Sequence, residues 1–281
     1  MLARSLDEFV DALEPTLDHG EYSAKSLERA RSSLTEALRS PAFIMDIVGR
    51  VLDSIAAGGD DWRNPPLAIR PDRGLRVHAI YWPPKFANPP HRHDTWTLAG
   101  VFYNRLIITT YRTDRQTAEA PGVERQIEAH CGEVGYLRPP CIHSFSNPTA
   151  RPAASLHIFS SAQPLNPLPE RSGSERKTTP STAPVGSSGK PATRALSTNV
   201  AILSQWVDPG VFALLDRSFQ MGDPNVKLAA VKAMCRLDPS RGARRLESLA
   251  STCTCVGADQ DRLRQIRDAL LSALDERGLR A

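Results

Sequence analysis

The positions of apolar residues along the chain predict a helical amino-terminal segment. Residues 5–8 read Ser-Leu-Asp-Glu, which is typical of a capping box, and apolar residues follow at helical spacing as far as Leu13. A second helix is predicted over about 26–38. A third helix follows Pro41, and its apolar face is formed by Phe43, Ile44, Ile47, Val48, Val51 and Leu52.

From about residue 75 the pattern changes to short β-rich runs. Pro, Gly, Asn and Asp residues separate these runs and indicate turns. The predicted strands are 77–82, 96–103, 105–111, 134–137 and 154–159. Many short strands with turns between them favour a sandwich or a small barrel. We therefore predict a mainly β domain over 1–160, with the amino-terminal helices included.

The remainder of the chain divides into a linker and a helical module. Residues 161–199 are dominated by Ser, Thr, Pro and Gly, which predicts a disordered linker. Residues 200–281 are predicted to form a small all-α domain, in which Asp223 is an N-cap and Pro224 the first helical residue. Further helices are expected over about 241–249 and 260–276.

One segment of this module has a repeat-like sequence. Residues 223–234 resemble one helix of a HEAT-type repeat, and such repeats stack helix pairs that often present a binding face. The module would then bind a partner protein or mediate self-association. A small helical bundle without a specific role is the alternative.

Composition and charge exclude some classes of partner. The formal net charge of +4 is small for 281 residues, and Lys and Arg are spread out, so no nucleic-acid partner is expected. No run approaches the roughly 18 apolar residues of a membrane helix, and the first residues lack the apolar core of a signal peptide. The five cysteines fit no disulfide framework. We therefore expect a cytoplasmic, reduced protein without a membrane partner.

Three histidines are the candidate chemistry of the β domain. His91 and His93 are two positions apart, so on a strand both side chains point to the same face. His143 follows about fifty residues later and can close a site of three imidazoles. Such a set leaves coordination positions open, which indicates a catalytic metal site. Imidazole suits zinc, copper, iron or nickel, so the ligands alone do not choose the metal.

The residues around these histidines form two motifs. The first is Tyr-Trp-Pro-Pro at 81–84, followed by Pro-His-Arg-His-Asp-Thr-Trp at 90–96. The second comprises Gly-Glu-Val-Gly at 132–135, Ile-His-Ser-Phe-Ser-Asn at 142–147 and Ala-Ser-Leu-His-Ile-Phe at 154–159. Over roughly 75–160 the chain thereby resembles the thiol dioxygenase branch of the cupin superfamily, which includes cysteine dioxygenase and 3-mercaptopropionate dioxygenase.

The resemblance implies a cupin barrel, a double-stranded β-helix, that holds a single non-haem Fe²⁺. His91, His93 and His143 would be its ligands. Typical cupins add a Glu ligand four or five residues after the second His, where this chain has Thr97 and Leu98. The neutral ligand set leaves the charge of the metal to be compensated by an anionic substrate.

The resemblance also implies residues around the metal. The branch carries a Ser-x-His-x-Tyr triad, of which Ser155 and His157 match the first two members as catalytic residues, while Phe159 lacks the third member's hydroxyl. Phe159 and Trp96 are expected to contact the substrate, although core packing is the alternative for Trp96. Arg70 is the candidate for the arginine that binds the substrate carboxylate. Its rivals are Arg63 and Arg76.

The expected function is therefore oxidation of a small thiol or amino-acid-like substrate with O2. Two alternatives stay open. Because Phe159 departs from the triad, the barrel could run another amino-acid oxidation, such as hydroxylation or cleavage. Alternatively, the chain is a non-catalytic metal-binding or ligand-binding cupin whose helical tail binds a partner.

Overall fold

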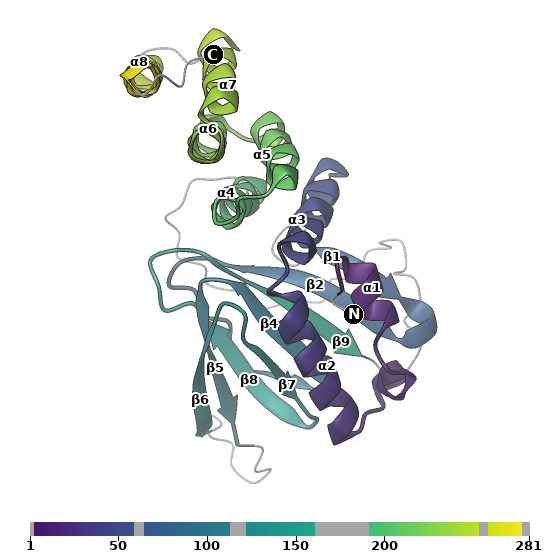
Figure 1. Ribbon diagram of the computed structural model, residues 1–281. Helices are drawn as coiled ribbons and strands as arrows, with labels where there is room; N and C mark the ends of the chain where they lie inside the picture. The colour runs from purple at the N-terminus through teal and green to yellow at the C-terminus, as the bar shows by residue number, and fades with distance from the viewer. Residues whose placement is uncertain (1–2, 59–64, 113–121, 161–190, 253–257, 277–281) are drawn as a thin grey trace. The chain divides into compact units, whose positions relative to one another are not determined.

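The computed structural model of the chain describes residues 3–58, 65–112, 122–160, 191–252 and 258–276 (Figure 1). The chain divides into two compact units, Met1–Ser188 and Gly189–Ala281. The first unit contains the amino-terminal helices and the β-strands, and the second is helical. The predicted fold class, a mainly β part with amino-terminal helices and an all-α carboxy-terminal part, is confirmed.

The first unit begins with α1 (Leu6–Asp11), a 3-10 segment (Pro15–Gly20), α2 (Ala24–Ala37) and α3 (Pro41–Ala56). Ser5 caps α1 as predicted, because its hydroxyl accepts from the backbone N–H of Glu8 over 3.3 Å. The Glu8 carboxylate accepts from the N–H of Arg4 over 2.7 Å, one residue further back than a capping box requires. All six apolar residues predicted for the face of α3 are buried.

The strands form two antiparallel sheets. The strands are β1 (Pro66–Arg70), β2 (Leu75–Trp82), β3 (His91–His93), β4 (Thr97–Tyr103), β5 (Arg105–Tyr111), β6 (Val123–His130), β7 (Val134–Leu137), β8 (Cys141–Ser146) and β9 (Ala153–Ser160). One sheet has the order β1-β2-β9-β4-β7 and the other β3-β8-β5-β6. The five predicted strands are all present. β1, β3, β6 and β8 are not among them, although the spacing of His91 and His93 had suggested a strand there. β6 is exposed along almost its whole length, so no apolar face marks it in the sequence.

The five-stranded sheet has a different environment on each face. α2 packs against β4 and β7 (Figure 1). A side chain added at Gly100 of β4 would meet Leu34 of α2 and Leu38, the residue directly after α2. The opposite face points into the interior between the two sheets. At one end this interior is filled by an apolar cluster of Trp82, Val101, Leu106, Phe145 and Ala153. The polar residues of the interior lie beyond that cluster.

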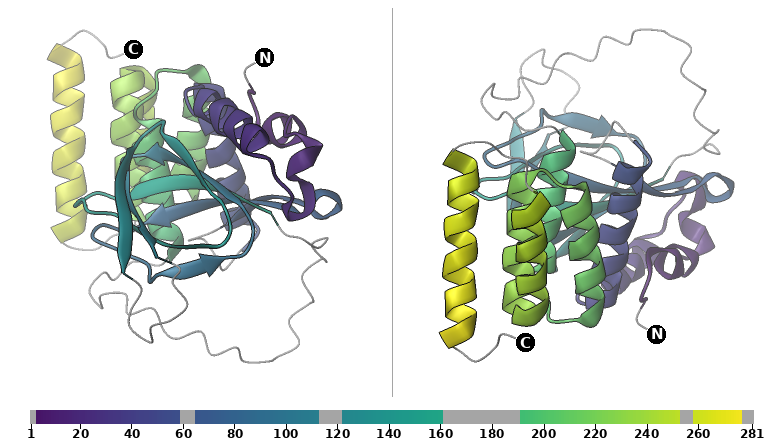
Figure 2. Two further views of the ribbon diagram at one scale, coloured as in Figure 1. Left: turned by 90° about the horizontal axis from the view of Figure 1, so that it is seen from below. Right: turned by 90° about the horizontal axis from the view of Figure 1, so that it is seen from above.

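The second unit consists of α4 (Pro191–Leu203), α5 (Pro209–Met221), α6 (Pro224–Leu237), α7 (Pro239–Thr252) and α8 (Ala258–Glu276). These helices lie side by side (Figure 2, right). Asp223 caps α6 as predicted, because its carboxylate accepts from the N–H of Val226 over 3.0 Å. Within the described parts of the chain, no helix is long and apolar enough to cross a membrane.

The linker prediction is corrected at its carboxy-terminal end. Residues 191–199 lie in α4, because Ala195, Leu196 and the residues that follow bury an apolar face. The rest of the predicted linker, 161–190, is outside the described residues.

Candidate metal centre

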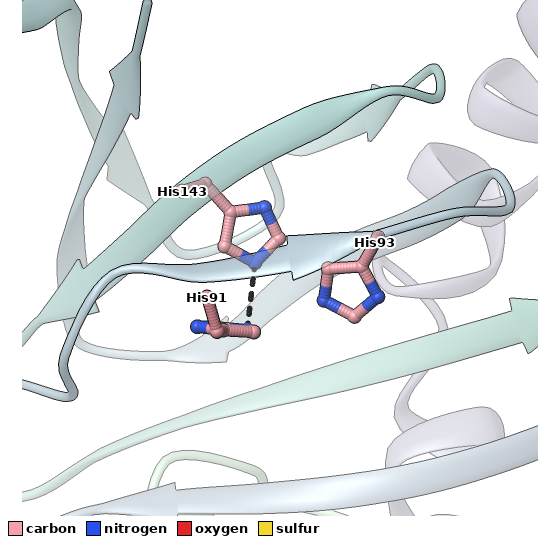
Figure 3. A group of neighbouring side chains, drawn as sticks. All are labelled: His91, His93 and His143. Carbon is pink, nitrogen blue, oxygen red and sulfur yellow. Dashed lines mark hydrogen bonds between the residues drawn. The ribbon is translucent and has the colours of Figure 1, made fainter. Parts of the chain in front are cut away.

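Strand pairing brings the three predicted histidines together. β3 pairs with β8 in antiparallel register, and His91 is directly opposite His143. His93 is two residues along the same strand and therefore shares the face of His91. The ring centroids are separated by 4.5 Å between His91 and His143, 5.0 Å between His91 and His93, and 4.8 Å between His93 and His143 (Figure 3). One potential ligand nitrogen from each ring lies within 4.8 Å of the others.

The environment of these rings favours the neutral imidazoles that bind metals. Burial lowers the pKa of His143 to about 3, and the neighbouring His91 and His93 add to this effect. Burial, and then the proximity of His91, also lowers the pKa of His93. Both rings are therefore uncharged near neutral pH, the state in which imidazole binds a metal.

The hydrogen bonds of His91 orient one of its nitrogens toward the centre of the cluster. Its Nδ1 lies 3.1 Å from the carbonyl oxygen of Pro89, so Nδ1–H can donate there and Nε2 is left as a ligand. Nε2 of His91 lies 3.1 Å from Nε2 of His143 (Figure 3). Three nitrogens thus converge, and the described residues add no carboxylate to the group. This donor set fits a divalent metal ion.

A hydrogen-bonded chain of three buried residues lies behind the histidines. Trp82 of β2 donates its indole N–H to the hydroxyl oxygen of Ser155 over 2.8 Å, and Ser155 Oγ lies 2.9 Å from Nε2 of His157. Because Trp82 can only donate, the Ser155 hydroxyl oxygen accepts from it, and the Ser155 hydrogen is left able to donate to Nε2 of His157. A neutral His157 ring that accepts at Nε2 carries its proton on Nδ1. Burial lowers the pKa of His157 to about 3. The sequence motifs indicated Ser155 and His157, but Trp82 was assigned no hydrogen-bonding role.

Aromatic rings lie between the hydrogen-bonded residues Ser155 and His157 and the three histidines. Phe159 stacks on His93, with ring centroids 5.7 Å apart and planes 15° apart, and it also stacks on His157 at 5.7 Å. Phe145 has its ring centroid 5.1 Å from those of His143 and His157. The predicted catalytic pair and Phe159 therefore lie in the same interior as the histidine cluster.

Arg70 and Trp96 were also predicted to contact the substrate. Arg70 is opposite Leu75 in the β1–β2 pairing, and its guanidinium forms ion pairs with Asp7 at 3.3 Å and Asp11 at 3.1 Å. It is therefore held by α1. Trp96 is fully buried immediately before β4, as expected for core packing, and Arg63 is outside the described residues.

Comparisons with solved structures give matches that extend over only about a third of the chain. The matches include an oxalate oxidase in complex with the substrate analogue glycolate, with 18% identity over 32% of this chain and 44% of that chain and a TM-score of 0.28. They also include a cupin superfamily protein from Desulfitobacterium hafniense, with 12% identity over 35% and 75% of the two chains and a TM-score of 0.28. A Bacillus subtilis oxalate decarboxylase with Mn(II) centres matches at 19% identity over 32% of this chain and 22% of that chain, with a TM-score of 0.28.

This chain spans less than half of the oxalate oxidase chain. No family model matches it, and no curated protein matches it. At such low TM-scores the likenesses carry no argument about substrate or reaction. The two antiparallel sheets of this chain form a β-sandwich, and its interior holds a candidate metal site of three histidines.

Proposed function

We propose that the protein is a mononuclear non-haem Fe(II) dioxygenase that oxidises a small thiol, or an amino-acid-like substrate, with O2. The observation that carries this proposal is the set of converging imidazoles without a carboxylate. A divalent ion held by three neutral ligands keeps its full charge and favours an anionic ligand such as a thiolate. The Ser155–His157 pair behind the cluster supports the same reaction class.

His91, His93 and His143 would hold the metal. A bound Fe²⁺ would supply the redox chemistry by which O2 oxidises a thiolate to a sulfinate, RS⁻ + O2 giving RSO2⁻. This overall reaction balances without a further reductant, so the protein needs to bind only the thiol and O2.

The protein's own residues hold protons and exclude water in this interior. His157 keeps a proton on Nδ1, because its Nε2 accepts from Ser155, and it stays neutral because it is buried. Phe159 presents an apolar ring beside His93 and donates no hydrogen bond. The apolar cluster around Trp82 and Phe145 closes one end of the interior.

Phe159 also supports a second candidate reaction. In the resembled branch a tyrosine hydroxyl stands at this position, and here a phenyl ring stacks on His93 instead. An oxidation that does not use that hydroxyl, such as cleavage of an amino acid in which both oxygen atoms of O2 enter the products, is compatible with the same metal ligands.

Anaerobic loading with Fe²⁺, followed by oxygen-uptake measurements with thiols and amino acids, tests both reactions. We expect one iron per chain and O2 consumption with at least one small thiol, and mass spectrometry should show a product heavier by two oxygen atoms. His143→Ala should lose iron and oxygen uptake together. His130→Ala, on the exposed strand β6, should retain both. A wild-type protein that binds no iron, or consumes no O2 with any of these compounds, contradicts the proposal.

A further inference from the structure

A cavity of about 440 Å³ lies in the second unit, at the place where α5, α6 and α7 meet. α6 contacts both α5 and α7, so the cavity is built within this unit (Figure 2, right). Its volume is in the range of ligand-binding pockets. The described residues that give it chemical character are Phe212 and Asp216 of α5, Met234 of α6, and Arg241, Arg244 and Arg245 of α7.

The three arginines form a row on one face of α7. Residues three and four positions apart are neighbours on a helix surface, and Arg241, Arg244 and Arg245 have this spacing. The row is about 6 Å long, since a helix rises about 1.5 Å per residue. Like charges at such spacing destabilise a helix, so the stability of α7 does not explain the row.

The carboxylates around the cavity neutralise only part of this charge. Arg245 forms an ion pair with Asp216 at 2.5 Å, and both side chains are about one third exposed. Arg241 lies 3.6 Å from Asp238, but its side chain is 55% exposed, so this pair is weak. Within the described residues no carboxylate pairs with the exposed Arg244. The cavity therefore keeps a positive charge and favours an anionic occupant.

The cavity also offers an apolar surface next to the charged row. The guanidinium carbon of Arg241 lies over the Phe212 ring, 4.8 Å from its centroid. A guanidinium that lies over an aromatic face can still donate hydrogen bonds from its edge. Met234 is buried and adds a second apolar wall. An occupant with both carboxylates and an apolar group would use all of these features.

We propose that this cavity binds an acidic segment of a partner protein. Carboxylates of the segment would pair with Arg241 and Arg244, and an apolar side chain would contact Phe212 and Met234. Side chains two positions apart in an extended peptide are about 6.6 Å apart on one face, comparable to the length of the arginine row. A row of donors suits several carboxylates along a chain better than one phosphate, which needs donors that converge on a point. The inference is independent of the reaction proposed for the first unit.

Fluorescence anisotropy with the full chain and synthetic peptides tests the proposal. The probes carry Glu at two alternate positions and Leu or Phe at the next alternate position, in both chain orders, and each has a counterpart with Gln for Glu. We expect at least one acidic probe to bind, and its Gln counterpart to bind about tenfold more weakly. Arg244→Gln should raise the Kd of the acidic probe about fivefold, because the lost ion pair is exposed.

Two controls separate recognition from a general effect of charge or folding. Arg236→Gln removes an exposed arginine of α6 that does not line the cavity, and it should change the Kd by less than about twofold. Combining Arg244→Gln with the Gln counterpart should cost no more than the counterpart alone, because both changes remove the same pair.

Four results would overturn the proposal. These are no binding of any acidic probe to wild type, equal weakening of acidic and Gln probes by Arg244→Gln, an equal effect of Arg236→Gln, and tighter, Arg244-dependent binding of a single-stranded oligonucleotide. Sedimentation of the chain alone tests a second copy as the occupant. An Arg244-dependent dimer would assign the cavity to self-association and overturn the partner segment.

Discussion

Trp82 donates its indole N–H to the hydroxyl of Ser155 across the β2–β9 pairing, over 2.8 Å. This bond occupies one acceptor position of the Ser155 oxygen and leaves the Ser155 hydrogen able to donate to Nε2 of His157, 2.9 Å away. We therefore expect Trp82 to act through Ser155 in setting the tautomer of His157, as a positioning residue.

Replacing Trp82 with Phe should disturb the hydrogen bonds that join Trp82, Ser155 and His157, while the same replacement at Trp96 should not. Trp96 is also buried, but among the described residues its indole N–H has no hydrogen-bond partner. Both variants lose packing, and only Trp82→Phe also loses a buried hydrogen bond, so its stability should fall by about 1 kcal/mol more. Urea unfolding measures this difference.

The ¹⁵N chemical shifts of the His157 ring give an independent measurement of the tautomer. We expect wild type and Trp96→Phe to show a single tautomer protonated at Nδ1, and Trp82→Phe to show a mixture. Identical imidazole shifts in all three proteins would contradict the positioning role of Trp82.

Gly100 allows α2 to pack closely on β4. A methyl group at this position would lie 2.5 Å from Cδ1 of Leu38 and 3.0 Å from Cγ2 of Val134. Gly100→Ala should therefore destabilise the protein by about 1–3 kcal/mol through overpacking. Gly135 on β7 is the matched control, because a methyl group there would meet nothing within 4 Å. Equal melting temperatures for the two variants would show that α2 adjusts without cost.

Arg50 should stabilise the first unit in a pH-dependent way. Its guanidinium bonds to Asp7 over 2.7 Å and to Asp46 over 2.9 Å, and the hydrogen bond from Arg50 lowers the pKa of Asp7 below its ordinary value of 3.8. A carboxyl group with a lowered folded pKa stabilises the protein above its unfolded pKa, and this contribution is lost as the pH falls through the folded value.

The stability lost in Arg50→Met should therefore be about 1 kcal/mol near neutral pH, a small value because the Asp7 carboxylate is half-exposed. The difference from wild type should shrink below about pH 3.8. Arg92→Met, at an exposed ion pair with Asp94, should show almost no difference at any pH. Unfolding by guanidinium chloride across the pH range checks this. A stability difference between Arg50→Met and wild type that stays constant with pH would exclude a role for Asp7.

The sequence was most informative where one short segment determines the geometry. His91 and His93 share a face because strand side chains alternate, and Asp223 caps its helix through a contact three residues away. The row formed by Arg76, Phe159 and Thr97 depends on pairings among β2, β4 and β9, which are distant in the chain. Register decides which residues share a face, so sequence alone favoured Arg70 although Arg76 is the arginine beside Phe159.

Strand β3 consists of three residues, and two of them are candidate metal ligands. It lies at the edge of its sheet and pairs with β8, which supplies the third. An ion bound by all three would cross-link the two strands. Metal binding and the pairing of this edge strand are then linked equilibria, in which each stabilises the other. Removing the ion would weaken the attachment of β3 as well as empty the centre, so local unfolding of one short strand becomes a measure of metal occupancy.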